Sequence, residues 1–202
     1  MPNISVVDYG VGNLRSVKRG LEKSGASVRI THDSNELEKS DAIVFPGVGA
    51  FAPAIKNLAP LSEAVRQWVK DGKPILGICL GLQLLFTRSS EGGSINGLDL
   101  IQGEVVKLPS KVKTPQIGWN TIDIVQPSPL LDGVENGSYV YFVHSYIPQP
   151  VDPHVTVACT DYGVRFPSIV AKRNLLATQF HPEKSGQVGS IMLKNFTKSL
   201  KG

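Results

Sequence analysis

Short apolar runs alternate with stretches of helical spacing through the first half of the chain. Leu14, Val17 and Leu21 follow Asn13 at helical spacing, which predicts an amphipathic helix that an Asn side chain caps. Further predicted helices carry apolar residues at positions 61, 65, 68 and 69, and at positions 82, 84, 85 and 86. The predicted strands are residues 4–7, 28–30, 42–45 and 75–78. Strands that alternate with helices in this way indicate a parallel sheet.

The second half of the chain has a different pattern. Short apolar runs separated by Pro and Gly predict strands at residues 105–108, 121–125, 139–143, 155–160, 168–171 and 175–180. Arg173-Asn174 is a plausible hairpin tip, and residues 193, 196 and 200 form one face of a last helix. We therefore expect an α/β fold with a doubly wound mixed sheet. Its parallel core takes antiparallel additions from the C-terminal half, with flanking helices and a single domain over residues 1–202.

Composition excludes several classes of protein. The 202 residues are 41% hydrophobic and 19% charged, as in ordinary globular proteins, and the net charge is only +4. No long Lys/Arg run is present, so nucleic-acid binding is not expected. No apolar stretch is long enough to span a bilayer, and no secretory signal is visible. With two cysteines in unlike contexts, Cys79 and Cys159, a cytoplasmic protein with free thiols is the simplest interpretation.

The strongest local motif is a cysteine between two glycines, Gly77-Ile78-Cys79-Leu80-Gly81, at a predicted strand-to-helix turn. It is the cysteine version of the nucleophile elbow. The N-terminus of the following helix favours the thiolate, and the Leu80 N–H points toward the oxyanion of a tetrahedral intermediate. The alternative is a buried structural cysteine. The strand–turn–helix context favours the nucleophile.

A cysteine nucleophile needs a proton carrier, for which histidine oriented by a carboxylate is the usual choice. His181 ends a predicted strand, Pro182 stops that strand, and Glu183 could reach back to the imidazole. His32 and His154 lie in polar loops and are expected to be solvated. His144 ends another predicted strand, and its role stays open. We therefore expect Cys79, His181 and Glu183 to be the catalytic residues.

These two motifs, in this chain order, resemble the signatures of the class I, triad-type glutamine amidotransferases. Pro46-Gly47-Val48-Gly49 resembles the oxyanion loop of that family. The resemblance implies an oxyanion hole formed by the Val48 and Leu80 N–H groups in a loop that includes Gly47. It implies that a peptide flip completes the hole, which the flanking glycines would permit. It also implies glutamine binding at Gly49, Gln83, Ser145 and Tyr146.

Within that family the chain is most similar to glutaminase subunits of imidazole glycerol phosphate synthase. The supporting stretches are residues 8–14, 118–120, 141–146 and 181–185. The resemblance implies ammonia transfer to a (β/α)₈-barrel cyclase, a partner surface that includes Asn13, Tyr141 and Lys184, and no cofactor or metal. One departure is visible: Gln116 and Ile117 stand where the family commonly has His and Met.

Three alternatives remain open on the sequence. The chain could be a triad-type glutaminase serving another synthase, such as those that make pyridoxal phosphate, anthranilate or GMP. It could be a partner-independent cysteine hydrolase of γ-glutamyl compounds. A catalytically inactive scaffold is the third alternative, and the intact cysteine, histidine and glutamate argue against it.

Overall fold

A large mixed sheet forms the centre of the molecule. The computed structural model describes residues 1–10 and 12–200. In spatial order the strands of the sheet are β2 (Ser27–Thr31), β1 (Asn3–Val7), β3 (Ala42–Phe45), β4 (Ile75–Ile78), β14 (Leu175–Thr178), β13 (Arg165–Lys172), β12 (Thr156–Asp161) and β9 (Asp123–Ile124). The strands from β2 to β14 pair in parallel, and β13, β12 and β9 are added antiparallel. This arrangement confirms the predicted fold class.

Two smaller sheets lie beside the main one. One pairs β10 (Tyr139–His144) with β8 (Gln116–Thr121), and the other has the order β11 (Tyr146–Pro150), β7 (Ile101–Lys107), β5 (Phe86–Ser89) and β6 (Ile95–Asn96). The runs at 105–108 and 139–143 were expected to extend the main sheet, and this expectation was wrong. Periodicity identifies a strand but does not say which neighbour it pairs with.

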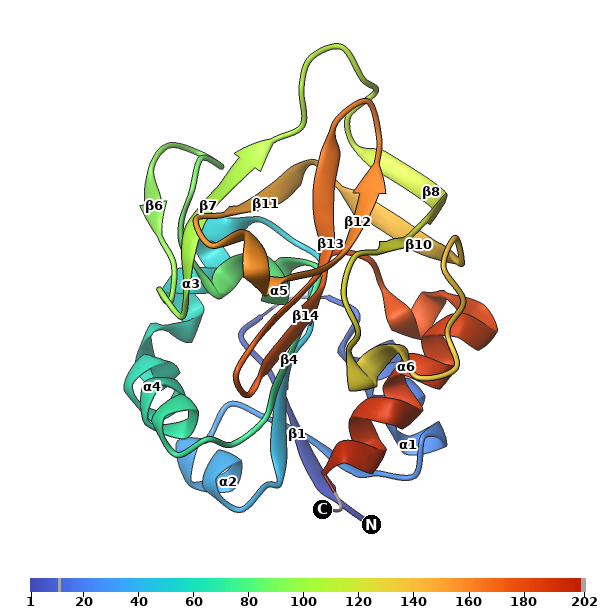
Figure 1. Cartoon of the computed structure of the whole chain (residues 1–202). Coiled ribbons are helices and arrows are strands. Elements are labelled where there is room, and N and C mark those ends of the chain that lie inside the picture. The colour runs from blue at the N-terminus through green and yellow to red at the C-terminus, as the bar shows by residue number, and fades with distance from the viewer. Residues whose placement is uncertain (11, 201–202) are drawn as a thin grey trace.

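Helices cover both faces of the main sheet (Figure 1). They are α1 (Leu14–Lys23), α2 (Ser34–Glu38), α3 (Phe51–Leu58), α4 (Ser62–Lys70), α5 (Leu80–Leu84) and α6 (Gly186–Ser199). Short 3₁₀ helices are η1 (Ala59–Leu61), η2 (Pro129–Leu131), η3 (Pro153–Val155) and η4 (Pro182–Lys184). The predicted helix through position 86 ends earlier, because Phe86 begins β5. A short run that is almost entirely apolar has no period that separates helix from strand.

Alternate residues of each central strand enter two separate cores. Val44 of β3 belongs to the core beneath α1 and α6, which also contains Val17 and Phe196. Its neighbour Phe45 belongs to the core on the opposite face, with Trp68 of α4. Because side chains alternate across a strand, a sheet covered on both faces needs the unbroken apolar runs seen in the sequence.

The carboxyl ends of β1, β3, β4 and β14 meet at one edge of the sheet. The segments that carry the motifs follow these strands directly: residues 8–13, 46–50, 79–81 and 179–183. Active sites of open α/β sheets form at this edge. In the described residues, no helix is long and apolar enough to cross a membrane.

Candidate active site

Cys79 occupies a strained turn between β4 and α5. Its φ of 52° and ψ of −104° lie outside the regions that non-glycine residues normally adopt. The Cys79 N–H donates to the carbonyl of Thr178 at 2.7 Å, which fixes the turn against the end of β14.

The two glycines of the motif allow the backbone to approach closely. A Cβ on Gly81 would overlap the Phe45 carbonyl of β3, and one on Gly77 would lie 2.9 Å from the Gly81 carbonyl oxygen. Real Cβ atoms essentially never approach that closely, so both positions require glycine.

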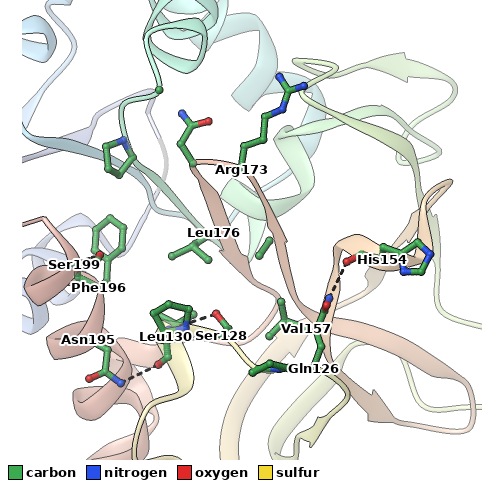
Figure 2. Close-up of a pocket in the computed structure, with 16 residues that line it drawn as sticks. Gln126, Ser128, Leu130, His154, Val157, Arg173, Leu176, Asn195, Phe196 and Ser199 are labelled. Carbon is green, nitrogen blue, oxygen red and sulfur yellow. Dashed lines mark hydrogen bonds between the residues drawn. The ribbon is translucent and has the colours of Figure 1, made fainter. Parts of the chain in front are cut away.

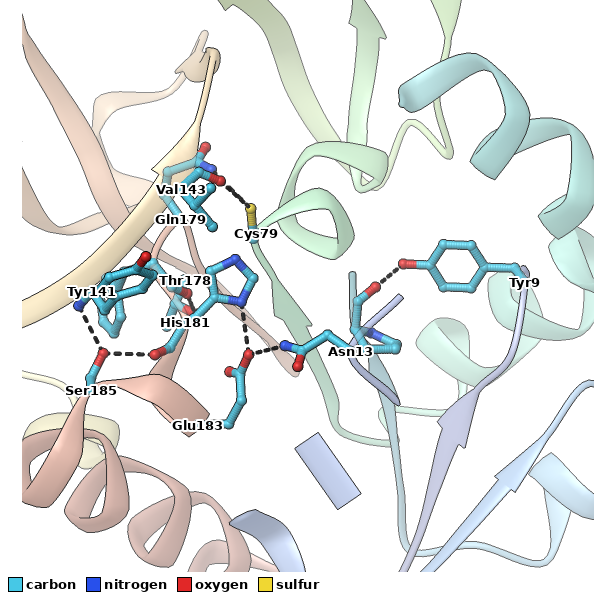
Figure 3. A network of polar contacts seen from close by, with 12 residues as sticks. Tyr9, Asn13, Cys79, Tyr141, Val143, Thr178, Gln179, His181, Glu183 and Ser185 are labelled. Atoms are coloured by element: carbon cyan, nitrogen blue, oxygen red, sulfur yellow. Dashed lines mark hydrogen bonds and ion pairs between the residues drawn. The ribbon is translucent and has the colours of Figure 1, made fainter. Parts of the chain in front are cut away.

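His181 and Glu183 form a buried pair beside Cys79 (Figure 3). The Nδ1 atom of His181 lies 2.7 Å from Glu183 Oε1, and both side chains are fully buried. Asn13 donates its Nδ2–H to the same carboxylate oxygen. Because a carboxylate accepts from Nδ1–H, the pair fixes the tautomer of the imidazole and directs Nε2 away from Glu183.

The surroundings of His181 favour its charged form. Burial lowers the pKa of His181, but the interactions with Cys79 and Glu183 outweigh burial and raise the pKa to about 9. His181 Nε2 is buried and forms no hydrogen bond with any residue that the structure describes. The Cys79 Sγ instead donates to the Val143 carbonyl at 3.6 Å. The imidazole therefore has one nitrogen held by Glu183 and one free for proton transfer.

The predicted oxyanion donors do not converge. The Leu80 N–H donates to the carbonyl of Gly47 at 3.5 Å. Because a trans peptide directs its C=O and N–H oppositely, the Val48 N–H points away from Leu80. A flip of the peptide between Gly47 and Val48 would free the Leu80 donor and turn the second donor toward it.

The peptides on either side of Gly47–Val48 are held by the segment that follows β1. The hydroxyl of Tyr9 donates to the Pro46 carbonyl, and the Gly12 N–H donates to the Val48 carbonyl at 3.3 Å. Tyr9 is buried, and burial, followed by the charge of Cys79, raises its pKa well above 10.0, so the hydroxyl stays a donor. Sequence reasoning missed this role of Tyr9, although the residue lies in a quoted motif.

A small pocket of about 230 Å³ opens beside the sulfur. This volume is below the roughly 300–1,000 Å³ typical of drug-sized ligands and suits a small one. The lining includes the predicted residues Val48, Gly49, Cys79, Leu80, Gln83, Ser145 and Tyr146, together with Glu91, Pro115, Val143 and His144. Sequence reasoning missed Glu91, because a glutamate in a polar turn has no pattern that marks it as a ligand.

The residues predicted for a partner interface lie next to this site. Lys184 Nζ is 5.9 Å from the centre of the Tyr141 ring, which in turn packs edge-on against Trp119. Trp119 is 56% exposed and its neighbour Ile117 63% exposed, so large apolar side chains face outward here. Asn13 lies deeper, with its side chain on Glu183.

The other histidines are not arranged for catalysis. His144 is buried, with Nδ1 2.9 Å from the Tyr146 carbonyl and Nε2 3.0 Å from Gln116. Burial lowers its pKa to about 4, so it is neutral. His32 is exposed. His154 borders a separate pocket of about 480 Å³ between α6 and the β13–β14 hairpin (Figure 2), which contains no cysteine. Among the described residues, no group of three His, Cys, Asp or Glu could hold a metal.

Comparison with known proteins shows the family of the chain. The profile of the Glutamine amidotransferase class-I family matches residues 5–200, so the chain belongs to this family. Its relatives include imidazole glycerol phosphate synthase subunits HisH. That of Caldanaerobacter subterraneus subsp. tengcongensis is 46% identical, with 98% of both chains covered. That of Methanosarcina mazei is 47% identical, with 98% of this chain and 99% of the relative covered.

Solved structures show the same fold at lower identity. PurLQS from Thermotoga maritima matches with a TM-score of 0.76 at 19% identity, over 99% of this chain and 97% of that chain. A putative GMP synthase protein from Thermoplasma acidophilum matches with a TM-score of 0.74 at 24% identity, over 100% of this chain and 94% of that chain.

Gly81→Ala is expected to destabilise the fold strongly, because the new methyl group meets backbone that cannot move aside. We expect a loss of about 3 kcal/mol in the free energy of unfolding, measured by urea titration. Gly72→Ala is the control: its methyl group enters open space, and its φ of 73° should cost only about 1 kcal/mol. Equal losses in the two variants would contradict the close-approach argument.

The raised pKa of His181 predicts a pH-dependent stability. A histidine that binds its proton more tightly when folded stabilises the fold fully below its unfolded pKa of about 6.5. This contribution should fall as pH rises through about 9. NMR titration should find the imidazole of His181 ionising near pH 9, and Glu183→Gln should lower that midpoint. A midpoint at or below 6.5 in the unchanged protein would overturn the assignment.

Proposed function

We propose that this chain is the glutaminase subunit of an imidazole glycerol phosphate synthase. It hydrolyses glutamine and passes the ammonia to a (β/α)₈-barrel cyclase subunit. The complex makes imidazole glycerol phosphate and aminoimidazole carboxamide ribotide in histidine biosynthesis. The observation that carries the proposal is the Cys79 turn beside the buried His181–Glu183 pair, in a chain 46–49% identical over nearly its full length to HisH subunits. These relatives weigh against glutaminases of other synthases.

The pocket beside Cys79 offers matching groups for glutamine. The Glu91 carboxylate is the acidic group that can pair with the α-ammonium of the substrate. In the structure, the Glu91 carboxylate accepts a hydrogen bond from the Phe51 N–H at the start of α3, and this bond holds the carboxylate at the rim of the pocket. Gly49, Gln83, Ser145 and Tyr146 supply backbone and amide groups to the rest of the substrate.

The catalytic steps follow from the arrangement of Cys79, His181 and Glu183. The Cys79 thiolate attacks the amide carbon, and a carbon–sulfur bond forms. The carbon–nitrogen bond then breaks, with His181 Nε2 giving its proton to the departing ammonia. Water attacks the thioester while His181 takes a proton from it, and glutamate leaves as the thiolate returns. Glu183 keeps Nδ1 protonated and stabilises the imidazolium throughout.

The oxyanion hole requires a rearrangement before this chemistry is fast. The backbone N–H groups of Val48 and Leu80 are the proposed oxyanion donors. The rotation that brings them together takes place at the peptide between Gly47 and Val48. In the structure, the Leu80 N–H donates its hydrogen bond to the Gly47 carbonyl and is therefore not available to an oxyanion. A carbonyl in that position would repel a developing oxyanion instead of stabilising it. Binding of the cyclase is proposed to drive the peptide flip.

The exposed aromatic surface beside the site is the proposed docking surface for the cyclase. Tyr141, Lys184 and Trp119 form it. Asn13, the fourth residue proposed for the interface, hydrogen-bonds Glu183. Tyr and Trp are enriched in protein interfaces. A surface this close to Cys79 would let ammonia pass without crossing bulk water. We propose that residues 1–202 act as one amidotransferase domain in the cytoplasm.

The isolated chain should release glutamate from glutamine very slowly, because its oxyanion donors do not converge. Addition of the cyclase with its nucleotide ligand should raise the rate by a factor of about 10² or more, the range for one oxyanion donor. The measurement is glutamate release by the chain alone and by the complex. Full activity of the chain alone would contradict the proposed gating.

Cys79→Ala should abolish glutamine-dependent product formation by the complex and leave ammonia-dependent formation intact. The variant removes the nucleophile but not the docking surface or the cyclase site. Cys159→Ala is the matched control, since that thiol lies on β12 away from the pocket and its loss should affect neither reaction. Loss of both reactions in Cys79→Ala would indicate a structural role for the cysteine.

A further inference from the structure

A buried amide contacts the nucleophile and has no part in the chemistry described above. Gln179 follows β14, is fully buried, and lies two residues before His181. Its Nε2 donates to Cys79 Sγ at 3.7 Å (Figure 3). Its Oε1 accepts from Gln83 Nε2 at 3.3 Å. An amide fully removed from water needs such partners, but nothing in packing requires that one partner be the reactive sulfur.

The orientation of the Gln179 amide follows from its neighbours. A backbone carbonyl can only accept, so the Gln83 atom 3.1 Å from the Tyr146 carbonyl must be the amide nitrogen. The same nitrogen gives its second proton to Gln179, whose oxygen therefore faces Gln83. The nitrogen of Gln179 is left to face the sulfur of Cys79. The Tyr146 carbonyl therefore determines, through the side chains of Gln83 and Gln179, that a donor faces the sulfur of Cys79.

That carbonyl is itself held by His144. Since burial keeps His144 neutral, its Nδ1 must carry the proton that it donates to the Tyr146 carbonyl. Its Nε2 then accepts. The atom placed 3.0 Å from Nε2 is Gln116 Oε1, and because two acceptors cannot form a hydrogen bond, we assign the amide of Gln116 the opposite way, with its nitrogen donating to Nε2. The two lone pairs of the Tyr146 carbonyl are occupied by His144 and Gln83. One continuous set of hydrogen bonds, which we term the amide relay, therefore joins Gln116, His144, Gln83 and Gln179 to Cys79.

We propose that the Gln179 amide stabilises the thiolate of Cys79 by an oriented N–H···S hydrogen bond, with the amide relay fixing its direction. The inference rests on Cys79 being the nucleophile of the proposed function. A hydrogen bond to the charged form of an acid favours that form. Beside the sulfur, the Val143 carbonyl accepts and so favours the thiol. Gln179 is a donor that offsets this effect, and the segment that carries Gln179 also carries His181.

The test measures how fast iodoacetamide alkylates Cys79 as a function of pH in the full chain. Gln179→Met keeps the size of the side chain but removes the donor. We expect the midpoint of the rate–pH curve to rise by about one pH unit, and alkylation at pH 7 to slow about tenfold. Peptide mass spectrometry reads Cys159 in the same molecules as an internal reference. Gln187→Met, on the exposed surface of α6, is the matched control and should leave the curve unchanged.

Kinetics of the complex separate this role from a purely structural one. Gln179→Met should lower kcat for glutamine with little change in KM, and ammonia-dependent product formation should stay at the wild-type rate. If Gln179→Met does not fold, Gln83→Met takes its place in the alkylation experiment, since loss of the relay frees the Gln179 amide to turn and should shift the curve upward. An unshifted curve in the folded variant overturns the proposal. Failure of the wild-type complex to hydrolyse glutamine counts against the proposed function instead, and the alkylation result still decides the hydrogen bond.

Discussion

The parallel pairing of β4 with β14 is the constraint on which the site depends. Ile78 and Thr178 are direct partners in this pairing, although one hundred positions separate them in the chain. Cys79 therefore leaves the sheet beside the residues that lead to His181, and the hydrogen bond between the Cys79 N–H and the Thr178 carbonyl fixes the two segments together. A slip of this register would separate Cys79 from His181, because a shift of one residue turns each side chain to the other face of the sheet.

Most of the fold could be predicted from sequence where the hydrophobic pattern is long or where Pro and Gly mark the end of an element. The strand at 42–45 ends at Pro46-Gly47, and the helix after Asn13 has regular spacing, so both were predicted correctly. The predicted cap was wrong, because the Asn13 side chain bonds Glu183 instead of the helix. The strand β5 and the helix α5 could not be separated, because residues 82–86 are almost uniformly apolar. The strand β8 was not predicted, apart from its last residue Thr121. Nothing in the local pattern indicated that β10 pairs with it outside the main sheet, since pairing is a property of tertiary structure.

The site was predictable to a different extent at each residue. Cys79, His181 and Glu183 stand in short motifs with a chemical reason for each member, and the structure brings them together. Glu91 and Gln179 have no such local signal, because their roles come from contacts with segments far away in the chain. Asn13 was assigned to a partner surface by resemblance, and in the structure its side chain hydrogen-bonds Glu183. The roles of Asn13, Tyr141 and Lys184 toward a partner stay predictions.

The hydrogen bonds of Tyr9 and Gly12 to the carbonyls on either side of the Gly47–Val48 peptide have a mechanical consequence. With both flanking carbonyls held, the middle peptide can turn about its own axis while the chain before and after it stays in place. Such a crankshaft rotation would replace the Gly47 carbonyl, an acceptor, by the Val48 N–H, a donor, without moving Cys79. The hydrogen bond that it must break, from the Leu80 N–H to the Gly47 carbonyl, is long at 3.5 Å. If this peptide flips as proposed, the two forms of the site would differ in the orientation of a single amide plane.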